Sequence, residues 1–377
     1  MKKFTDILTC VLFCGFLGLM LVLFLVTPHQ ETSELEKKAL QDPPALEQEA
    51  VLSGQYGKEA EDYIAEQLPG RSFFVGVNAY YDLWSGRQGT KDILLAEGGR
   101  LVEKPNTFDK SAIAQKMGII NAFSQTVSQP VDLMIVPSSG YMVRREICGV
   151  HDAFTDDAIL AHAYSQAGEN VRPVDLLTAF AAEEPGKLYY RTDHHWTSLG
   201  AYKAYAAYME GLGKAYPAQN EFAVEGHSGF YGTTYSRSGL WLTEPDTVEL
   251  WDGGKALTVT IQKNRQDPGT THDGLFYREH LGAMDMYPVY LDGIHPIVRV
   301  QNPQGQGKIL VIRDSYASCL GTFLANSYAE VVLVDLRYHH DRDYPISKMV
   351  AEEGFDQILV CYSLNNFLTD SNFGWLK

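Results

Sequence analysis

The chain has 377 residues, of which 45% are hydrophobic and 21% charged, so it carries enough apolar material to bury a large core. Its 47 acidic residues outnumber its 31 basic ones, and the formal net charge is −16. This excess of negative charge argues against nucleic acid as a partner and against electrostatic adhesion to anionic lipid.

The N-terminal region predicts a membrane anchor. Residues 7–26 contain no charged side chain, and about 20 apolar residues suffice to cross roughly 30 Å of hydrocarbon. Lys2 and Lys3 precede this segment, whereas the first charge after it is Glu31, so the positive-inside rule favours a cytoplasmic N-terminus and an extracytoplasmic body. A cleaved signal peptide is the alternative, but its apolar region would be shorter and end in a small-x-small cleavage site. We therefore expect a single-pass protein of the cell membrane.

Beyond the anchor, the pattern predicts a stalk and then a body. Residues 28–54 are rich in Glu, Gln and Pro and form the stalk, which leaves residues 1–27 as the cytoplasmic tip and anchor. The body is expected over residues 55–377. It opens with helical spacings over residues 55–84, interrupted at Pro69-Gly70, and with a hairpin-like run over residues 92–101.

Strand and helix patterns then alternate, which favours an α/β class with a layered sheet and helices on both faces. Residues 218–300 interrupt this order with short β-like runs and are predicted to form a β-rich insertion. The predicted strands lie at residues 131–136, 187–190, 308–312, 330–335 and 357–361, and the helices at residues 111–127, 156–168, 198–212 and 345–353 and from residue 316.

Two distant motifs supply an acid, an imidazole and a hydroxyl. In an extended segment, residues two apart point the same way, so Asp193 and His195 would share a face while His194 points away. Ser315 follows a predicted strand and precedes a predicted helix, where free N–H groups can stabilise an oxyanion. An imidazole that takes the serine proton, oriented by a carboxylate, makes the hydroxyl a nucleophile. We expect these groups to meet at the carboxyl edge of the sheet.

Further residues are predicted around this site. The Ser315 backbone N–H would be one oxyanion donor, and the side chain of Asn365 or Asn366 would be another. Three more candidates for contact with substrate are Trp196, His295 and Arg337. Each has a plainer alternative, since a tryptophan can simply be core, a histidine can cap a turn, and an arginine can pair with a structural carboxylate.

The motif residues also have other interpretations. Ser315 could be an ordinary helix N-cap, because serine there satisfies a free N–H group of the first turn. Asp193, His194 and His195 could form half of a metal site, with residues 339–341 as the nearest further candidates. No cysteine pair has C-x-x-C spacing and no further ligand cluster completes the half-site, so we expect neither a metal nor another cofactor.

Taken together, the motifs resemble the bacterial DHHW protein family, whose wider kin are SGNH-hydrolase-like proteins that include alginate O-acetyltransferases. The resemblance extends from about residue 60 to the C-terminus and implies an SGNH-hydrolase-like fold. It also implies a triad of Asp193, His195 and Ser315 in permuted order, since ordinary SGNH hydrolases place the nucleophile first. Arg313 departs from the glycine that those hydrolases have before Asp-Ser. The motifs that carry the resemblance lie at residues 192–197, 229–232, 290–296, 312–316 and 335–338.

Two functions follow as expectations. The first is a membrane-anchored extracytoplasmic O-acyltransferase or esterase, with the resemblance implying acetyl transfer on cell-envelope polysaccharide. A multispanning membrane acyltransferase would then be the acyl donor, because an enzyme on the outer face has no acetyl-CoA. The second is a non-catalytic envelope protein that binds glycan or assists polysaccharide assembly.

Overall fold

The computed structural model describes residues 2–376, and the chain divides into two compact units. The first unit contains the chain up to residue 91 together with residues 236–242. The second contains residues 92–235 and the chain from residue 243 onward. This boundary differs from the one expected at residue 54, because the helices over residues 55–84 belong with the N-terminal part of the chain.

The first unit is helical. Its helix α1 (Lys2–Val26) is the one helix among the described residues that is long and apolar enough to cross a membrane. The predicted break at Pro69-Gly70 separates α3 from α4, and Gly70 adopts φ 72°, a left-handed conformation that suits glycine. The remaining elements of this unit are β1 (Thr32–Ser33), β2 (Lys38–Ala39), α2 (Gln48–Ser53), α3 (Gln55–Gln67), α4 (Arg71–Trp84) and β3 (Gly89–Thr90).

The second unit is built on an eight-stranded mixed sheet with the order β11-β10-β12-β14-β13-β15-β6-β7. The five strands from β14 to β7 run parallel, and β12, β10 and β11 continue the sheet in antiparallel pairs. The strands are β6 (Val131–Val136), β7 (Val171–Pro173), β10 (Thr258–Gln262), β11 (Thr270–Asp273), β12 (Ile297–Gln301), β13 (Lys308–Arg313), β14 (Glu330–Asp335) and β15 (Gln357–Ser363).

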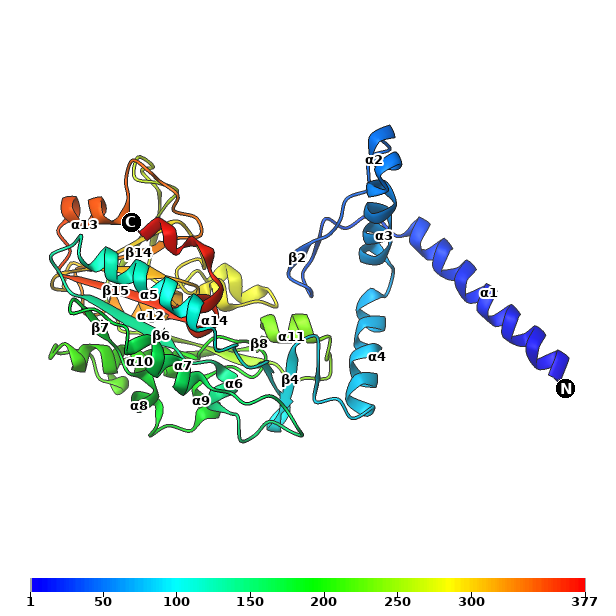
Figure 1. Ribbon diagram of the computed structural model, residues 1–377, viewed down its shortest axis with the longest axis horizontal. Helices are drawn as coiled ribbons and strands as arrows, with labels where there is room; N and C mark the ends of the chain where they lie inside the picture. Colours follow the sequence, from blue (N-terminus) through cyan, green and yellow to red (C-terminus); the bar gives the residue numbers. More distant parts are fainter. Residues whose placement is uncertain (1, 377) are drawn as a thin grey trace. The chain divides into compact units, whose positions relative to one another are not determined.

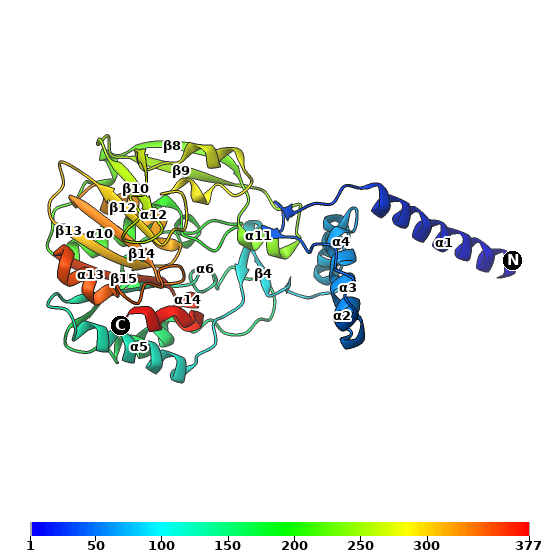
Figure 2. The same cartoon turned by 90° about the horizontal axis from the view of Figure 1, so that it is seen from above.

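Helices cover both faces of this sheet, as the sequence predicts (Figures 1 and 2). Because side chains alternate along a strand, Ile309 and Val311 enter one core with α10 (Ser198–Gly211) and α12 (Tyr316–Leu324). Leu310 and Ile312 enter the other core, which α5, α7, α13 and α14 cover. These four helices span Lys110–Ser124, Asp156–Tyr164, Ile346–Glu353 and Leu364–Thr369.

The predicted insertion over residues 218–300 is only partly separate from the sheet. Its strands β10, β11 and β12 extend the central sheet, whereas β8 (Ala223–Phe230) and β9 (Asp246–Asp252) form their own antiparallel pair. The predicted hairpin is present as β4 (Ile93–Ala96) and β5 (Arg100–Glu103). Short helices complete the unit at α6 (Ser139–Met142), α8 (Leu176–Phe180), α9 (Pro185–Leu188) and α11 (Thr233–Ser238), whose last residues belong to the first unit.

One predicted strand is wrong. Residues 187–190 fall partly in α9, which begins at Pro185, a residue that suits the first turn of a helix. The chain then makes a single antiparallel bridge between Tyr189 and Trp196. The segment between these two residues is therefore a turn, and it carries the predicted acid and base.

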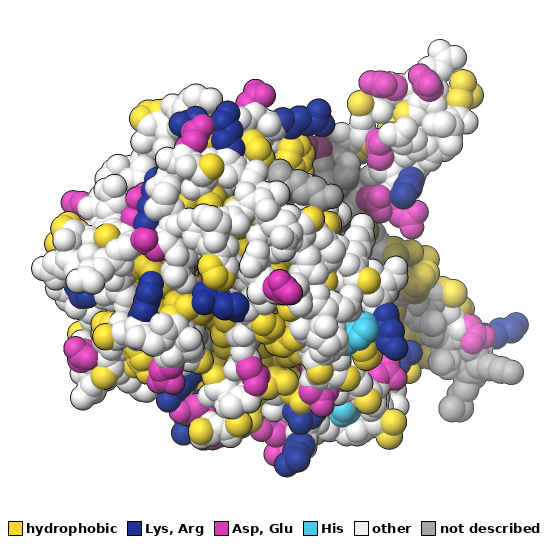
Figure 3. Space-filling view, turned by 60° about the vertical axis from the view of Figure 1, so that its left-hand side comes forward, with side chains coloured by type: hydrophobic (Ala, Val, Ile, Leu, Met, Phe, Trp, Pro, Cys, Tyr) yellow, Lys and Arg dark blue, Asp and Glu magenta, His cyan; other side chains and the backbone are white. Residues whose placement is uncertain are grey.

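Charge is spread over the second unit. On the face shown in Figure 3, Lys and Arg side chains lie scattered among Asp and Glu side chains, with no large patch of one sign.

Candidate active site

Ser315 lies where β13 ends and α12 begins. It is the N-cap residue of α12, with φ −64° and ψ −24°, yet its side chain makes no capping hydrogen bond. Instead its Oγ lies 2.7 Å from Nε2 of His195. The hydroxyl therefore contacts the imidazole rather than the helix, which is the arrangement that separates a candidate nucleophile from a plain N-cap.

Asp193 and His195 are held together in a tight turn. Oδ1 of Asp193 accepts a hydrogen bond from the backbone N–H of His195 at 2.8 Å and also contacts Nδ1 of its ring. The other carboxylate oxygen accepts from the N–H of Thr233 at 2.6 Å. Both side chains are almost fully buried. Because Asp193 holds Nδ1, the Nε2 atom faces Ser315.

The turn also places His194 differently from the extended geometry expected. The rings of His194 and His195 lie 4.1 Å apart between centroids, so His194 does not point away from the site. Its Nδ1 is buried and has no hydrogen-bond partner among the described residues, although 26% of the side chain is exposed. Burial, followed by the neighbouring His195, lowers the pKa of His194 and favours the neutral ring.

Gly232 makes room for the acid. A Cβ atom at this position would overlap the side chain of Asp193. The glycine N–H donates to Oγ1 of Thr192 at 3.2 Å, which fixes the loop beside the carboxylate. This close approach accounts for the glycine that ends the motif at residues 229–232.

Two tyrosines enclose the imidazole. The ring of Tyr287 stacks on His195 with 3.8 Å between centroids and an interplanar angle of 13°, and Tyr316 lies 4.9 Å away. The Tyr287 hydroxyl donates to the carbonyl of Ser315 at 3.4 Å, and that of Tyr316 donates to the carbonyl of His194. Burial raises the pKa of both phenols, so they act as neutral donors that fix the serine and histidine loops.

Asp314 anchors the serine loop from the other side. One oxygen accepts from the N–H of Tyr316 at 3.0 Å. The other accepts from the N–H and hydroxyl of Ser363 and from Nδ2 of Asn366, at 2.7 to 2.8 Å. The predicted Asn366 is thus tied to the residue before Ser315, with one amide hydrogen remaining. The predicted Asn365 is exposed on α14.

Arg313 fills the position where ordinary SGNH hydrolases have glycine. Its side chain is fully buried, and its guanidinium donates to the carbonyl of Gly293 at 3.2 Å and to the hydroxyl of Ser318 at 2.8 Å. Its Nε has no partner among the described residues. Burial lowers its pKa, and Asp335 acts in the opposite direction. Arg313 therefore fastens the loop around Gly293 to the strand that carries Ser315.

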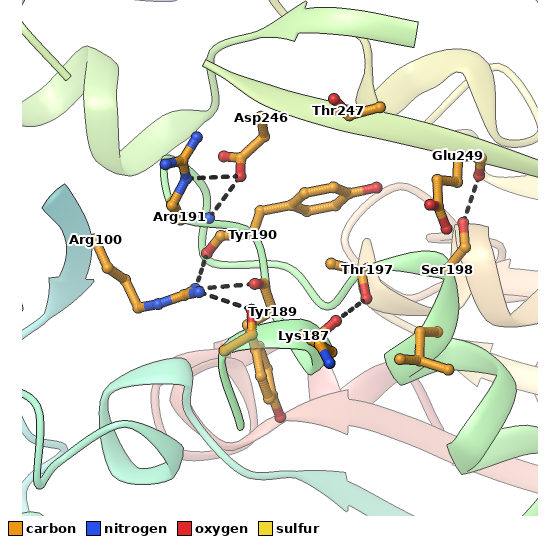
Figure 4. A pocket seen from close by; sticks show the side chains of 12 residues that line it. Arg100, Lys187, Tyr189, Tyr190, Arg191, Thr197, Ser198, Asp246, Thr247 and Glu249 are labelled. Atoms are coloured by element: carbon orange, nitrogen blue, oxygen red, sulfur yellow. Dashed lines mark hydrogen bonds and ion pairs between the residues drawn. The ribbon is translucent and has the colours of Figure 1, made fainter. Parts of the chain in front are cut away.

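The turn is supported from behind by a second carboxylate. Asp246 accepts from the N–H of Thr192 at 2.7 Å and from its hydroxyl at 2.6 Å, and the N–H of Arg191 donates to the other oxygen at 3.0 Å. Arg100 donates to the carbonyls of Tyr189 and Tyr190 at 2.8 to 2.9 Å. Figure 4 shows the contacts of Asp246 with Arg191 and of Arg100 with the two carbonyls, at the wall of a cavity of about 310 Å³ that flanks the turn.

Three predicted substrate contacts are engaged in structural interactions. Trp196 is fully buried and donates from Nε1 to the carbonyl of Tyr316 at 3.0 Å, so its ring belongs to the core and offers no surface for stacking a sugar. Arg337 pairs with the buried Asp335 at 2.6 Å. His295 contacts the carboxylate of Asp292 at 2.9 Å.

The metal alternative meets a geometric difficulty. One potential ligand atom each from Asp193, His194 and His195 lies within 4.8 Å of the others. However, both ring nitrogens of His195 already face Asp193 and Ser315, so a metal could bind this ring only by breaking one of those contacts. His339 is buried elsewhere and contacts the carbonyl of Tyr344 at 3.2 Å.

The sequence-based prediction did not identify several residues that support the site. Asp314 stands directly before the predicted serine, and this position was the available signal. Tyr287 and Asp246 lie in the segment predicted as an insertion and reach the site only through the fold. Nothing in their local sequence indicates that role.

Comparisons with known proteins agree with this architecture. A model of the DHHW protein family matches residues 105–334. A stretch of 184 residues is 25% identical to the probable alginate O-acetylase AlgJ of Pseudomonas putida and covers 46% of this chain and 48% of that protein. The match therefore spans about half the length of this relative.

Two solved structures are similar over nearly their whole length. A DHHW family protein from Eubacterium siraeum aligns with a TM-score of 0.64 and 21% identity, covering 76% of this chain and 95% of the other. PatB1 of Bacillus cereus, solved with a sulfonyl adduct, aligns with a TM-score of 0.63 and 20% identity, covering 76% and 98%. At these identities the likeness establishes the fold, and the predicted SGNH-hydrolase-like α/β class is confirmed.

Proposed function

This chain belongs to the DHHW protein family, and from that membership and the contacts of Ser315 we propose that it is an O-acyltransferase or esterase of the cell envelope. The observation that carries the proposal is the Ser315 hydroxyl, which contacts the His195 imidazole although it occupies a helix N-cap. A serine with only a structural role would cap the helix.

In the proposed reaction, Oγ of Ser315 attacks the carbonyl carbon of an acyl donor while Nε2 of His195 takes the hydroxyl proton. The imidazolium is stabilised by Asp193 and then gives its proton to the departing oxygen. An ester between Ser315 and the acyl group remains. In the second half, His195 takes a proton from an acceptor hydroxyl, whose oxygen attacks the carbonyl carbon of this ester. As the bond to Ser315 breaks, His195 returns the proton to Oγ of the serine.

The developing oxyanion needs hydrogen-bond donors. We assign this role to the backbone N–H of Ser315 at the start of α12 and to the remaining amide hydrogen of Asn366, whose side chain Asp314 holds beside the serine loop. Asn365 is the second choice because its side chain is exposed on α14.

Acceptor, donor and location are part of the same proposal. The relative described as a probable alginate O-acetylase supports acetyl as the acyl group and a cell-envelope polysaccharide as acceptor. The apolar α1 supports attachment to the cell membrane, and Lys2 and Lys3 before its apolar segment support a body outside. A body outside the cell has no acetyl-CoA, so a multispanning membrane acyltransferase is the proposed donor.

The test is active-site labelling of the full chain in detergent. A sulfonyl fluoride should label Ser315, as located by mass spectrometry, and p-nitrophenyl acetate should release p-nitrophenol. His195→Ala should abolish both reactions because the serine loses its base, whereas His162→Ala on α7 should leave both unchanged. A folded protein that neither reacts with the probe nor cleaves the ester would exclude the enzyme and favour the non-catalytic glycan-binding alternative.

A further inference from the structure

The ring of Tyr287 lies almost flat against the imidazole of His195. The two ring centroids are 3.8 Å apart, and the ring planes differ by 13°. Two uncharged aromatic rings prefer an offset or edge-to-face arrangement, with about 4.5 to 7 Å between centroids. The observed pair is closer than this and nearly parallel, so one ring faces the other. This geometry is not the one that a neutral imidazole would favour.

A positive charge on the imidazole changes this preference. A cation is attracted to the face of an aromatic ring when it lies within about 6 Å of the ring centroid. In the proposed reaction, His195 takes the Ser315 proton on Nε2 and stays positively charged until it gives that proton to the departing oxygen. The contact with Tyr287 is therefore stronger while the histidine is charged. Only interactions that strengthen in this way raise the rate of the chemical step.

The surroundings of the imidazole make such a contact important. The side chain of His195 is only 8% exposed, so water cannot hydrate the charge that it acquires. Asp193 compensates this charge at Nδ1, on the edge of the ring, whereas Tyr287 covers a face. Burial lowers the pKa of His194, so this neighbour stays neutral and does not oppose the charge. Burial also raises the pKa of the Tyr287 phenol, which therefore acts as a neutral ring.

Groups other than the imidazole hold Tyr287 in place. Its hydroxyl lies 3.4 Å from the carbonyl oxygens of both Ser315 and Tyr316. Its ring meets that of Tyr290 edge to face, with 5.4 Å between centroids. Its backbone N–H donates to Oδ1 of Asp285 at 3.2 Å. The ring is thus oriented before the histidine takes a proton, and no reorganisation is needed during the reaction.

We propose that Tyr287 is a positioning residue whose aromatic face stabilises the protonated form of His195. This inference rests on the proposed function, because only a reaction that protonates His195 gives the ring a charge to stabilise. Tyr287 acts through the histidine. Loss of its electrostatic contribution should therefore slow the chemical step and leave substrate binding unchanged.

Ring fluorination separates this electrostatic role from packing, because each fluorine withdraws electron density from the face of the ring and nearly preserves its shape. The full chain in detergent is prepared as Tyr287→Phe and with phenylalanines that carry one, two or three ring fluorines at residue 287. The maximal rate of Ser315 acetylation by p-nitrophenyl acetate should fall with each fluorine, by about tenfold over the series. The ester concentration that gives half of this rate should stay constant. Tyr287→Phe keeps the aromatic face and should retain most of the wild-type rate.

The matched control is the same set of fluorinated phenylalanines at residue 323. Phe323 is a buried ring of α12 that packs against four other aromatic rings of the core, those of Tyr202, Tyr205, Phe222 and Trp251. Fluorination there should leave the rate of acetylation unchanged.

Two results would overturn the inference about Tyr287 alone. One is an equal rate for all fluorinated rings at residue 287 in a protein whose wild type is active. The other is a graded loss of the same size at residue 323. A wild type that reacts neither with p-nitrophenyl acetate nor with a sulfonyl fluoride would instead overturn the proposed function, and the role of Tyr287 would fail with it.

Discussion

The side chain of Asp193 occupies the space in which a Cβ atom of Gly232 would lie. The two residues are 39 positions apart, and the N–H group that follows the glycine donates to the aspartate at 2.6 Å. The acid is thus positioned by a missing side chain as well as by hydrogen bonds. Asp193 can orient His195 only if it keeps both the space beside Gly232 and its hydrogen bonds.

Gly232→Ala should therefore impair catalysis without removing any proposed catalytic group. The new methyl group must displace Asp193 or its own loop, and a misplacement of about 1 Å can lower a rate about a hundredfold. The measurement is p-nitrophenyl acetate hydrolysis by the full chain. Gly211→Ala, at a helical position with open space around it, is the control and should keep the wild-type rate. A fully active Gly232→Ala protein would show that the acid tolerates the shift.

The two histidines of the motif should differ in importance. His195→Ala removes the imidazole whose Nε2 contacts Ser315, so the rate constant should fall by several orders of magnitude. His194→Ala removes a ring that is tilted against that of His195 with 4.1 Å between centroids, and the loss should stay within about tenfold. Similar losses from both variants, with inactivation of the wild type by chelators and recovery with zinc, would point to a metal site instead.

His194 should also make stability depend on pH. Its pKa is lowered in the folded protein from the usual value of 6.5, chiefly by burial, so below that value the unfolded chain binds a proton more readily than the folded one. The free energy of unfolding should consequently fall as the pH drops from 6.5 through the folded pKa. Burial lowers the pKa of His339 as well, which adds a slope of the same sign.

This dependence is measured by urea unfolding at a series of pH values. His194→Asn should flatten the slope and keep the part due to His339, whereas Ser315→Ala should retain the full wild-type slope. Identical slopes in His194→Asn and the wild type would contradict the predicted protonation of the unfolded chain.

Arg313 should matter for stability. Arg313→Ala removes the bonds from the guanidinium to Gly293 and Ser318 and opens a cavity, at a cost of about 3 kcal/mol in the free energy of unfolding. Arg87→Ala, which removes an exposed guanidinium paired with Asp82, should change stability by less than about 0.5 kcal/mol. Urea midpoints give both values. Equal midpoints for Arg313→Ala and the wild type would refute the anchoring role.

The topology has a direct test. If α1 is an uncleaved anchor with its N-terminus inside, protease added to intact protoplasts should digest the body, while untreated cells keep the full-length chain in the membrane fraction. Protease added to lysed protoplasts is the control, because a body inside the cell would be digested only after lysis. A soluble mature chain that begins near residue 28 would instead identify a cleaved signal peptide.

The hydrophobic pattern was sufficient to predict strands at the centre of the sheet. The strand predicted at residues 131–136 and that at residues 330–335 have the observed bounds, because each is a short apolar run buried on both faces. The strand predicted at residues 187–190 failed, since Pro185 starts a helix there. The runs at residues 258–262 and 297–301 are short, and their pairing into the central sheet depends on distant partners that a local pattern does not specify.

In the site, too, local sequence predicted some features, whereas others depend on contacts between distant segments. Asp193, His195 and Ser315 stood out by residue type and by their place between elements, and the structure brings their side chains into contact. The position of His194 was misjudged because an extended chain was assumed where a turn closes. The stacking of Tyr287 on the imidazole could not be predicted, since it joins segments about 90 residues apart only after folding.

The order of the strands has a consequence for how the protein is made. Within the described sheet, β13, β14 and β15 are the last strands along the chain, yet they occupy its middle, between β12 and β6. During synthesis the earlier strands can form only two separate pieces, β6 with β7 and β10 with β11 and β12. The two pieces are joined only when β13, β14 and β15, over residues 308–363, have been made, which places this chain among slowly folding topologies. A growing chain thus carries Asp193 and His195 long before it has Ser315, and the proposed triad stays incomplete until β13 and the residues that follow it have left the ribosome.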